Sequence, residues 1–554
     1  MELTLSHTSL LRLRHYYMEF TMLFRFFLFP LTLLFFTACG GGGSSSSTDD
    51  GSKYSLEYKG LTFFSKDMSK ESYKLSALSD DEFNQLTEVQ KLQVADKLLS
   101  SLFFGYEYKQ LQEKIDSGSF LSDTYNALSK ESTQREWLES YITDPTYFVQ
   151  GRTNSESTTI LTRFYAAKEL DSYFFNNYIA FILTQTIMFS PAYELESSHY
   201  PNVATTYNNI VRLLEDEATF SNITYTHMMS EENWRRFRSP EDNGREMLEI
   251  FASDTDDAHV PLAAKALQNW KLDRDNDTLV VTLNENTQAI KLFGSTIYNG
   301  DDFYRELVKS DDFKRTIIRR LVEFFFGESS ERDSITNTIF KSNPKTWQDI
   351  LKQILFSKEY LLNNSRAKSA EEIFFSLTKK INFKHRDNTL EYFKYRLTDM
   401  HQAVMKYKLG KLQRVPLDTL SFITAYKYFR EEVVLRYSDE KYADEYSKWQ
   451  AQGWRDSFVA NENFEYMPED VKGSLESLIE YIFHFILLRD ATKEELAMFE
   501  KRMLTTKDSQ TVLSFEFDMF TQKDTQERNK RNIVMSVLDY ITRVDSFYLY
   551  KEVK

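Results

Sequence analysis

The residues of this chain best suited to chemistry lie in one charged segment between Glu241 and Glu249. Glu241, Arg245 and Glu249 are spaced four residues apart, so on a helix they would form a ladder of ion pairs along one face. Glu246 stands beside Arg245, and a carboxylate that lines a cleft can act as a general acid or base. One interpretation is therefore a hydrolase with Arg245, Glu246 and Glu249 as catalytic residues. The other is a structural ladder, which we favour because such ladders are common structural devices.

A second polar cluster follows directly, with Asp254, Asp256, Asp257 and His259. Carboxylate oxygens and one imidazole can hold a divalent cation, so Asp254, Asp256 and His259 are weak candidates for metal ligands. His259 also stands where the next helix is expected to begin, and acidic residues near a helix start are favoured by the helix dipole without any ion. We favour the capping interpretation and expect no tightly bound metal and no cofactor.

A third acidic segment imitates the opening of a calcium-binding loop with Asp273, Asp275 and Asp277. The match fails at the sixth position, where Thr278 replaces Gly, and at the twelfth, where Asn284 replaces Glu. The segment is therefore only a weak indication of calcium binding.

Two basic stretches could meet the phosphates of lipids or sugars. They are Arg235-Arg236-x-Arg238, and Lys314-Arg315 with Arg319-Arg320. Helices flanked by Asp and Glu usually pair such charges internally, so we favour a structural role. The formal net charge of -15 argues against nucleic acid as a partner, because phosphate binding requires a cationic surface.

The elements that position these residues are predicted to be helices. The 554 residues include only 16 Gly and 9 Pro, and this scarcity of breakers favours long helices over turn-rich sheets. Capping boxes, in which a Ser or Thr oxygen and a Glu or Gln three residues later satisfy free amide groups, mark helix starts at Ser79, Thr87 and Thr492. Gly105 and Gly327 follow apolar runs where a left-handed residue is expected to end a helix.

Strands are expected in few places. Residues 278–283 and 287–293 alternate around the polar turn 284–286, which predicts a small β-hairpin, and an extended piece is expected near 54–64. The apolar run 475–488 is too short to span a membrane, so we predict a buried core helix. The predicted fold class is mainly α, a large multi-helix, bundle-like body with a small β-hairpin insertion.

The charged segment Pro240 to Phe251 begins a series of motifs in the middle of the chain. Around it stand Phe164 to Tyr193, Ala263 to Trp270, the hairpin to Gly294, Phe313 to Gly327 and Lys368-Ser369-Ala370-Glu371. In order and spacing these motifs resemble the bacterial domain-of-unknown-function family numbered 1800, over roughly residues 130–470. The resemblance implies no established activity. This chain has Glu285-Asn286 and Gln268-Asn269-Trp270 where the family shows His-Asp and Thr-Gly-Trp, so a role of the His-Asp pair does not carry over.

The amino terminus predicts export and lipid attachment. Residues 26–36 form an apolar stretch too short for a hydrocarbon core of about 30 Å, so we interpret 1–38 as a signal peptide. The sequence Phe36-Thr37-Ala38-Cys39 resembles a bacterial lipobox, with Phe where Leu is commoner, and this resemblance implies that Cys39 is acylated. The Gly/Ser-rich residues 39–53 would then form a flexible tether. An ordinary secretory signal with an incidental Cys39 is the alternative.

The rest of the chain is divided into an N-terminal helical segment (54–130), a family-like helical core (131–470) and a C-terminal helical segment (471–554). Since no Asp follows Cys39, the protein resembles outer-membrane lipoproteins, held in the bacterial cell envelope through its lipid. We expect a helical scaffold or binding module for an envelope protein or glycan. The alternative is a carboxylate-dependent hydrolase acting on a carbohydrate or related polymer.

Overall fold

The structure is a computed structural model. It divides into two compact units, residues 1–71 and residues 72–554. The described residues are 55–58, 61–64, 75–143, 156–188, 203–234, 237, 239–273, 275–276, 278–281, 289–327, 329, 331–380, 389–400, 402, 419–429, 475–504, 537–538 and 540–553. The predicted signal peptide and tether lie outside them, as do Cys39, Arg235, Arg236, Arg238, Asp277, Asn284, Glu285 and Asn286.

In the first unit, the described residues form one antiparallel hairpin. Strand β1 (Ser55–Tyr58) pairs with β2 (Leu61–Phe64), and Ser55 lies opposite Phe64. The extended segment predicted near 54–64 is confirmed.

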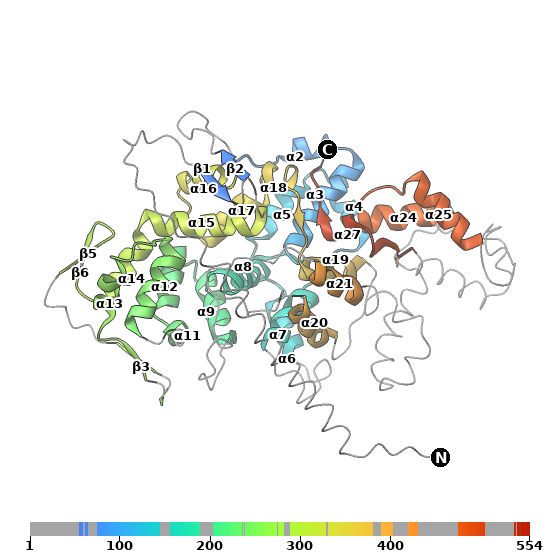
Figure 1. The fold of residues 1–554 in the computed structure, drawn as a ribbon. Coiled ribbons are helices and arrows are strands. Elements are labelled where there is room, and N and C mark those ends of the chain that lie inside the picture. Colours follow the sequence, from blue (N-terminus) through green and yellow to red (C-terminus); the bar gives the residue numbers. More distant parts are fainter. Residues whose placement is uncertain are drawn as a thin grey trace, which may run out of the picture. The chain divides into compact units, whose positions relative to one another are not determined.

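The second unit is built mainly from α-helices, which confirms the predicted fold class (Figure 1). Up to residue 188 the helices are α2 (Asp80–Asn84), α3 (Glu88–Ser101), α4 (Tyr108–Asp116), α5 (Phe120–Ala127), α6 (Arg135–Thr143), α7 (Glu156–Ala166) and α8 (Ser172–Thr186). The next helices are α9 (Val203–Glu215), α10 (Phe220–Met228), α11 (Glu231–Trp234), α12 (Pro240–Ala252), α13 (Val260–Leu267), α14 (Gly300–Lys309), α15 (Asp311–Phe326) and α16 (Arg332–Lys341). The last are α17 (Trp347–Leu355), α18 (Lys358–Leu361), α19 (Ala370–Lys380), α20 (Thr389–Asp399), α21 (Thr419–Lys427), α24 (Leu475–Leu487), α25 (Lys493–Leu504) and α27 (Asp545–Tyr548).

The three predicted capping boxes are confirmed. At the start of α2, the Ser79 hydroxyl accepts a hydrogen bond from the Glu82 amide, and the Glu82 carboxylate accepts one from the Ser79 amide. Thr87 with Gln90 starts α3 in the same way. Thr492 with Glu495 starts α25. Each box satisfies amide groups that the first helical turn leaves without partners.

The end of α3 differs from the prediction. Phe103, with φ of 61°, takes the left-handed conformation that was expected at Gly105. Gly105 serves close packing instead, because a Cβ atom there would lie 2.3 Å from the Phe375 carbonyl oxygen and 2.2 Å from a Lys379 side-chain atom. Gly327 ends α15 with the expected positive φ of 65°, but its ψ of -144° is not that of the left-handed helical conformation.

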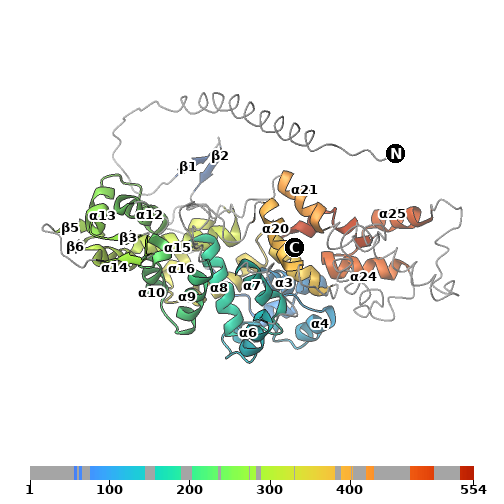
Figure 2. The ribbon, with the colours of Figure 1, turned by 90° about the horizontal axis from the view of Figure 1, so that it is seen from below.

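Aromatic side chains form the centre of the core. The Phe103 ring packs edge-on against Phe164 and Phe181, with ring centres 5.5 and 5.2 Å apart, and lies 5.8 Å from Phe375. These rings come from the end of α3 and from α7, α8 and α19. Figure 1 shows α19 near α3 and α8, and Figure 2 shows α3, α7 and α8 close together. Edge-to-face pairs of this kind add stability beyond the area they bury.

The small sheets are all two-stranded and antiparallel among the described residues. They join β3 (Lys271–Asp273) to β4 (Thr278–Val280), β5 (Ile290–Leu292) to β6 (Ser295–Ile297), and β7 (Arg366–Ala367) to β8 (Leu549–Tyr550). Of the predicted strands, 278–280 and 290–292 are extended, and they pair with other strands instead of with each other. Residues 282–288, which include the predicted turn, lie outside the described residues. Phe293 and Gly294 both have positive φ, which suits a two-residue turn that folds β5 onto β6 instead.

The apolar segment 475–488 forms α24, whose residues are mostly buried, so the predicted core helix is confirmed. Within the described part of the chain, no helix has the length and apolar character needed to cross a membrane. The pairing of β7 with β8 brings residues 366–367 beside the C-terminal residues 549–550.

Candidate functional site

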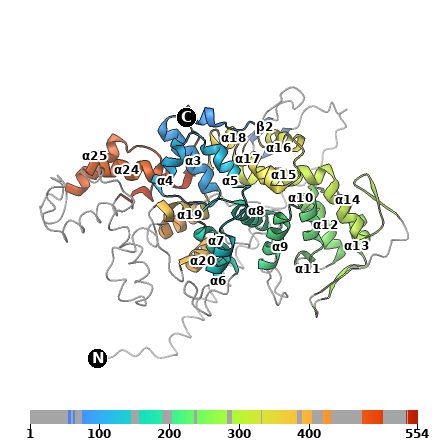
Figure 3. The same cartoon turned by 180° about the vertical axis from the view of Figure 1, so that it is seen from behind.

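The predicted catalytic residues lie on α12, which packs tightly into the second unit. The helix begins after Ser239, whose hydroxyl accepts from the Asp242 amide at 3.2 Å. Its apolar face packs against α13 and α15, and α14 lies beside these helices (Figure 3). A Cβ atom on Gly244 would approach the Ala263 Cβ to 2.9 Å, so glycine permits the close contact of α12 with α13.

The charged side chains of α12 lie on the outer face of the helix. The Arg245 guanidinium lies 4.0 Å from the Glu241 carboxylate and 3.9 Å from the carboxylate of Asp257, and Arg245 is 45% exposed. The expected pair between Arg245 and Glu249 is not formed, and the ladder is therefore half as long as predicted. Glu249 is exposed and Glu246 is half-buried. An open helix surface, with Arg245 shared between two solvent-facing carboxylates, supports weak ion pairing.

The polar cluster of Asp254, Asp256 and His259, which follows α12, forms hydrogen bonds within its own loop. The Asp254 carboxylate accepts from the Asp256 amide at 3.0 Å and lies 2.6 Å from His259 Nδ1, while Asp256 accepts from the Ala258 amide at 2.9 Å. His259 occupies the capping position of α13, but its side chain does not bond to the helix amides as capping would require. Across the described ranges, no group of three or more His, Cys, Asp or Glu side chains is placed to hold a metal ion.

The calcium-like segment is the turn between β3 and β4. Asp273 accepts from the amides of Asp275 and Asn276, at 3.1 and 3.3 Å, and from the Asn276 side chain at 2.9 Å. The Asn276 side chain and these amides lower the pKa of Asp273. This hydrogen bonding accounts for Asp273 as a turn residue.

The basic residues of α15 are paired largely as the structural interpretation predicted. The Arg319 guanidinium lies 3.4 Å from Glu323, and Arg320 donates to the Glu249 carbonyl oxygen at 3.3 Å. Arg315 donates to Asn337 at 2.6 Å. These contacts tie α15 to α16 and α12.

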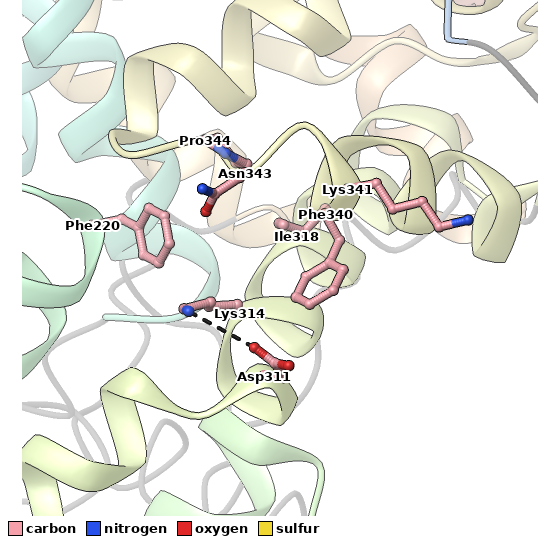
Figure 4. Close-up of a pocket in the computed structure, with 8 residues that line it drawn as sticks. All are labelled: Phe220, Asp311, Lys314, Ile318, Phe340, Lys341, Asn343 and Pro344. Carbon is pink, nitrogen blue, oxygen red and sulfur yellow. Dashed lines mark ion pairs between the residues drawn. The ribbon is translucent and has the colours of Figure 1, made fainter.

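A cavity lies beside Lys314, between α10, α15 and α16 (Figure 4). It measures about 240 Å³ and is lined by four apolar and four polar residues: Phe220, Ile318, Phe340 and Pro344, and Asp311, Lys314, Lys341 and Asn343. Lys314 Nζ lies 3.8 Å from the Asp311 carboxylate, while the Lys341 side chain extends away from the other residues (Figure 4). Asp311 therefore supplies the single carboxylate that lines the cavity, and this carboxylate is already paired with Lys314.

A buried charge cluster lies where α3 and α19 pack together and β7 pairs with β8, and sequence analysis missed it. We use this name for the six charged side chains of Asp96, Lys97, Arg366, Lys368, Glu372 and Lys380. The charged ends of these side chains are brought together from residues nearly 300 positions apart.

Asp96 and Lys380 form the first ion pair of the buried charge cluster. Lys380 Nζ lies 2.7 Å from Asp96 Oδ1, and both side chains are almost fully buried. Tyr106 donates its hydroxyl to the same oxygen at 2.5 Å. Burial opposes the charged carboxylate, but attraction to Lys380 and Lys368 outweighs it and lowers the pKa of Asp96 to about 2.

Arg366 and Glu372 form the second pair. Two guanidinium nitrogens of Arg366 donate to the two Glu372 oxygens at 2.9 and 2.6 Å, the geometry of a strong bidentate pair. Arg366 also donates to the Tyr360 hydroxyl at 2.6 Å. Burial opposes the charge on Arg366, but Glu372 holds the pKa of Arg366 well above its usual range.

Lys97 has a neutral partner. Its Nζ donates to the Asn364 carbonyl oxygen at 2.5 Å. Burial, followed by repulsion from Arg366, lowers the pKa of Lys97 well below its usual range, while Glu372 and Glu552 oppose that shift.

Lys368 is the remaining cation, and within the described residues its amine makes no hydrogen bond or ion pair. It lies 4.9 Å from the centre of the Tyr550 ring, over which it makes a cation–π contact. Burial is the main reason that the pKa of Lys368 falls to about 8. The buried Tyr550 hydroxyl likewise has no hydrogen-bond partner in the described part of the chain.

Comparison of the chain with protein-family models, with curated proteins and with solved structures found no match. The resemblance to the domain-of-unknown-function family numbered 1800 therefore stays a prediction from motif order. The fold and the sites define a mainly α protein with an exposed charged helix, a small cavity and a buried charge cluster.

Lys368 had a signal in the sequence, because it begins the motif Lys368 to Glu371 that carried part of that resemblance. Asp96, Lys97 and Lys380 had none, since charged residues inside helical patterns usually face solvent. Only the packing of α3 on α19 brings them to Lys368 and makes the group visible.

Proposed function

We propose that this protein is a lipid-anchored component of the bacterial envelope, attached through Cys39, whose helical body binds an envelope protein or glycan. The observation that carries the binding role is the cavity between α10, α15 and α16. Apolar side chains combined with a few polar groups are typical of recognition sites. At about 240 Å³ the cavity would take one side chain or one small group of a larger partner.

The cavity supports binding better than hydrolysis. A glycoside hydrolase needs two carboxyl groups on either side of the scissile bond. The cavity has only Asp311, which is paired with Lys314. Glu246 and Glu249 lie on α12, where Glu249 is exposed on an open helix surface. No observation specifically favours the hydrolase alternative.

The binding role can be tested with Lys314→Glu, which places two carboxylates side by side among the residues that line the cavity. The matched control is Lys309→Glu, since Lys309 is 66% exposed on α14 and pairs with Glu306 outside the cavity. Detergent-solubilised full-length variants should be tested for co-sedimentation with purified peptidoglycan, and for photo-crosslinking in cells from a probe at Asn343.

We expect wild type and Lys309→Glu to bind alike, and Lys314→Glu to weaken binding about tenfold, which corresponds to about 1.4 kcal/mol. Equal binding by all three variants, with no crosslink from Asn343, would show that the cavity is not the recognition site.

A further inference from the structure

The buried charge cluster contains more positive than negative charge. Its four basic side chains face two carboxylates, and burial lowers the pKa of Lys97, one of the four, well below its usual range. Both carboxylates are used in close pairs, Asp96 with Lys380 and Glu372 with Arg366. Protein interiors rarely keep a charge without a counter-charge, because removing it from water is costly. Among the described residues, Lys368 is therefore the cation of the cluster that has no carboxylate in a close pair with it.

Lys368 lies next to a second group that has no partner in the described part of the chain. Lys368 is partly exposed as a residue, so it lies at the edge of the cluster. Tyr550 is 5% exposed and its buried hydroxyl has no hydrogen-bond partner among the described residues. The Lys368 amine lies over the Tyr550 ring, 4.9 Å from its centre, so these two residues are direct neighbours.

We propose that Lys368 and Tyr550 bind an oxyanion, a phosphate or carboxylate group, which would supply the counter-charge that the cluster lacks. The ammonium of Lys368 donates hydrogen bonds to the anion, and so does the Tyr550 hydroxyl. Arg366 and Lys97 lie beside the same Tyr550 ring, at 4.8 and 5.9 Å from its centre, and add positive potential. This site is separate from the cavity of the proposed function and stands on its own observations.

Binding should depend on the protonation of Lys368. The charged and titratable groups that face its amine are Asp96, Glu372, Arg366, Lys380 and Tyr550. Burial lowers the pKa of Lys368 to about 8, so its amine is charged at pH 7 and largely neutral at pH 9.5. Sulfate is a suitable probe for this test because its own charge does not change over that range.

The experiment compares full-length protein in detergent with three variants. Lys368→Met removes the charge and keeps the length of the side chain, and Tyr550→Phe removes only the hydroxyl. Lys551→Met is the matched control, since Lys551 is the next residue along from Tyr550, is 57% exposed and pairs with Asp545. Binding of inorganic phosphate, of glucuronate as a carboxylate-bearing sugar, and of sulfate is measured by calorimetry, with sodium chloride at equal ionic strength as the reference.

We expect wild type and Lys551→Met to bind at least one of the first two anions, and the stronger of the two identifies the ligand class. Lys368→Met should lose binding by about tenfold or more, and Tyr550→Phe should weaken it by a smaller factor. Without ligand, Lys368→Met should melt above wild type, because an uncompensated cation is gone; a Lys368 that only supports the fold would give the opposite shift.

Two results would overturn the proposal. One is that wild type binds neither phosphate nor glucuronate beyond the chloride reference. The other is that Lys368→Met binds as wild type does. Sulfate binding that stays constant from pH 7 to 9.5 would exclude the Lys368 ammonium as the group that holds the anion.

Discussion

Asp96→Ala should destabilise the protein more than any surface charge substitution. The Asp96 carboxylate accepts hydrogen bonds from Lys380 at 2.7 Å and from Tyr106 at 2.5 Å, in a position with 1% exposure. Removing it leaves the buried Lys380 ammonium without its counter-charge and close to Lys368. Breaking a buried pair in this way costs about 3 to 5 kcal/mol.

The lowered pKa of Asp96 provides a second measure of how much this carboxylate stabilises the folded protein. A pKa lowered from the ordinary 3.8 to about 2 corresponds to about 2 kcal/mol of stability at neutral pH. This is smaller than the cost of Asp96→Ala, because protonation keeps the carboxyl group in place while the substitution also removes its hydrogen bonds. We therefore expect the larger value for the variant. The folded pKa is the lower one, so this contribution is complete above pH 3.8 and is lost as pH falls through 2.

The assay is urea denaturation at pH 7 followed by far-ultraviolet circular dichroism, with two comparisons. Glu88→Ala breaks the exposed pair with Lys91 on the same helix and should cost no more than about 1 kcal/mol. Asp96→Ala combined with Lys380→Met should recover most of the loss, since no charge of that pair remains. If Asp96→Ala unfolds at the same urea concentration as Glu88→Ala, the Asp96–Lys380 pair does not stabilise the fold by several kcal/mol.

Three other substitutions test further parts of the structure. Arg245→Ala should lower stability by no more than about 1 kcal/mol, because its two ion pairs are exposed and long, and a large loss in thermal melting would show that the α12 ladder is a major stabilising feature. Gly105→Ala should lower the melting temperature markedly, since the added methyl group would meet the Phe375 carbonyl at 2.3 Å, and an unchanged melting temperature would mean that α19 can move away. Phe164→Ala should cost about 3 to 5 kcal/mol in urea denaturation, because it removes a ring from the aromatic core, and a cost below about 1 kcal/mol would show that the core closes over the gap.

Local signals in the sequence were sufficient for the helical fold class. The capping boxes at Ser79, Thr87 and Thr492 depend on side chains three residues apart, so the sequence alone could locate them. The strand pairing was not local in the same sense. The stretch 278–280 could pair with the preceding or the following strand, and it pairs with the preceding residues 271–273. The following strand, 290–292, turns back at Phe293-Gly294 and pairs with 295–297.

The sites were harder to predict than the elements. Spacing placed Glu241, Arg245 and Glu249 on one helical face, but it could not show whether that face is buried, and the structure leaves it open to solvent. The buried charge cluster depends on contacts such as Asp96 with Lys380, which are 284 residues apart in the chain. Contacts of that kind follow from tertiary packing, and no pattern within a single helix reveals them.

The central claim, a lipid-anchored envelope protein, is tested most directly by mass spectrometry of the N-terminal peptide of the mature protein, purified from bacterial membranes. We expect the peptide to begin at Cys39 and to carry acyl chains, and Cys39→Ser to remain unprocessed. A mature peptide that begins elsewhere, or an unmodified Cys39, would contradict the proposed anchor.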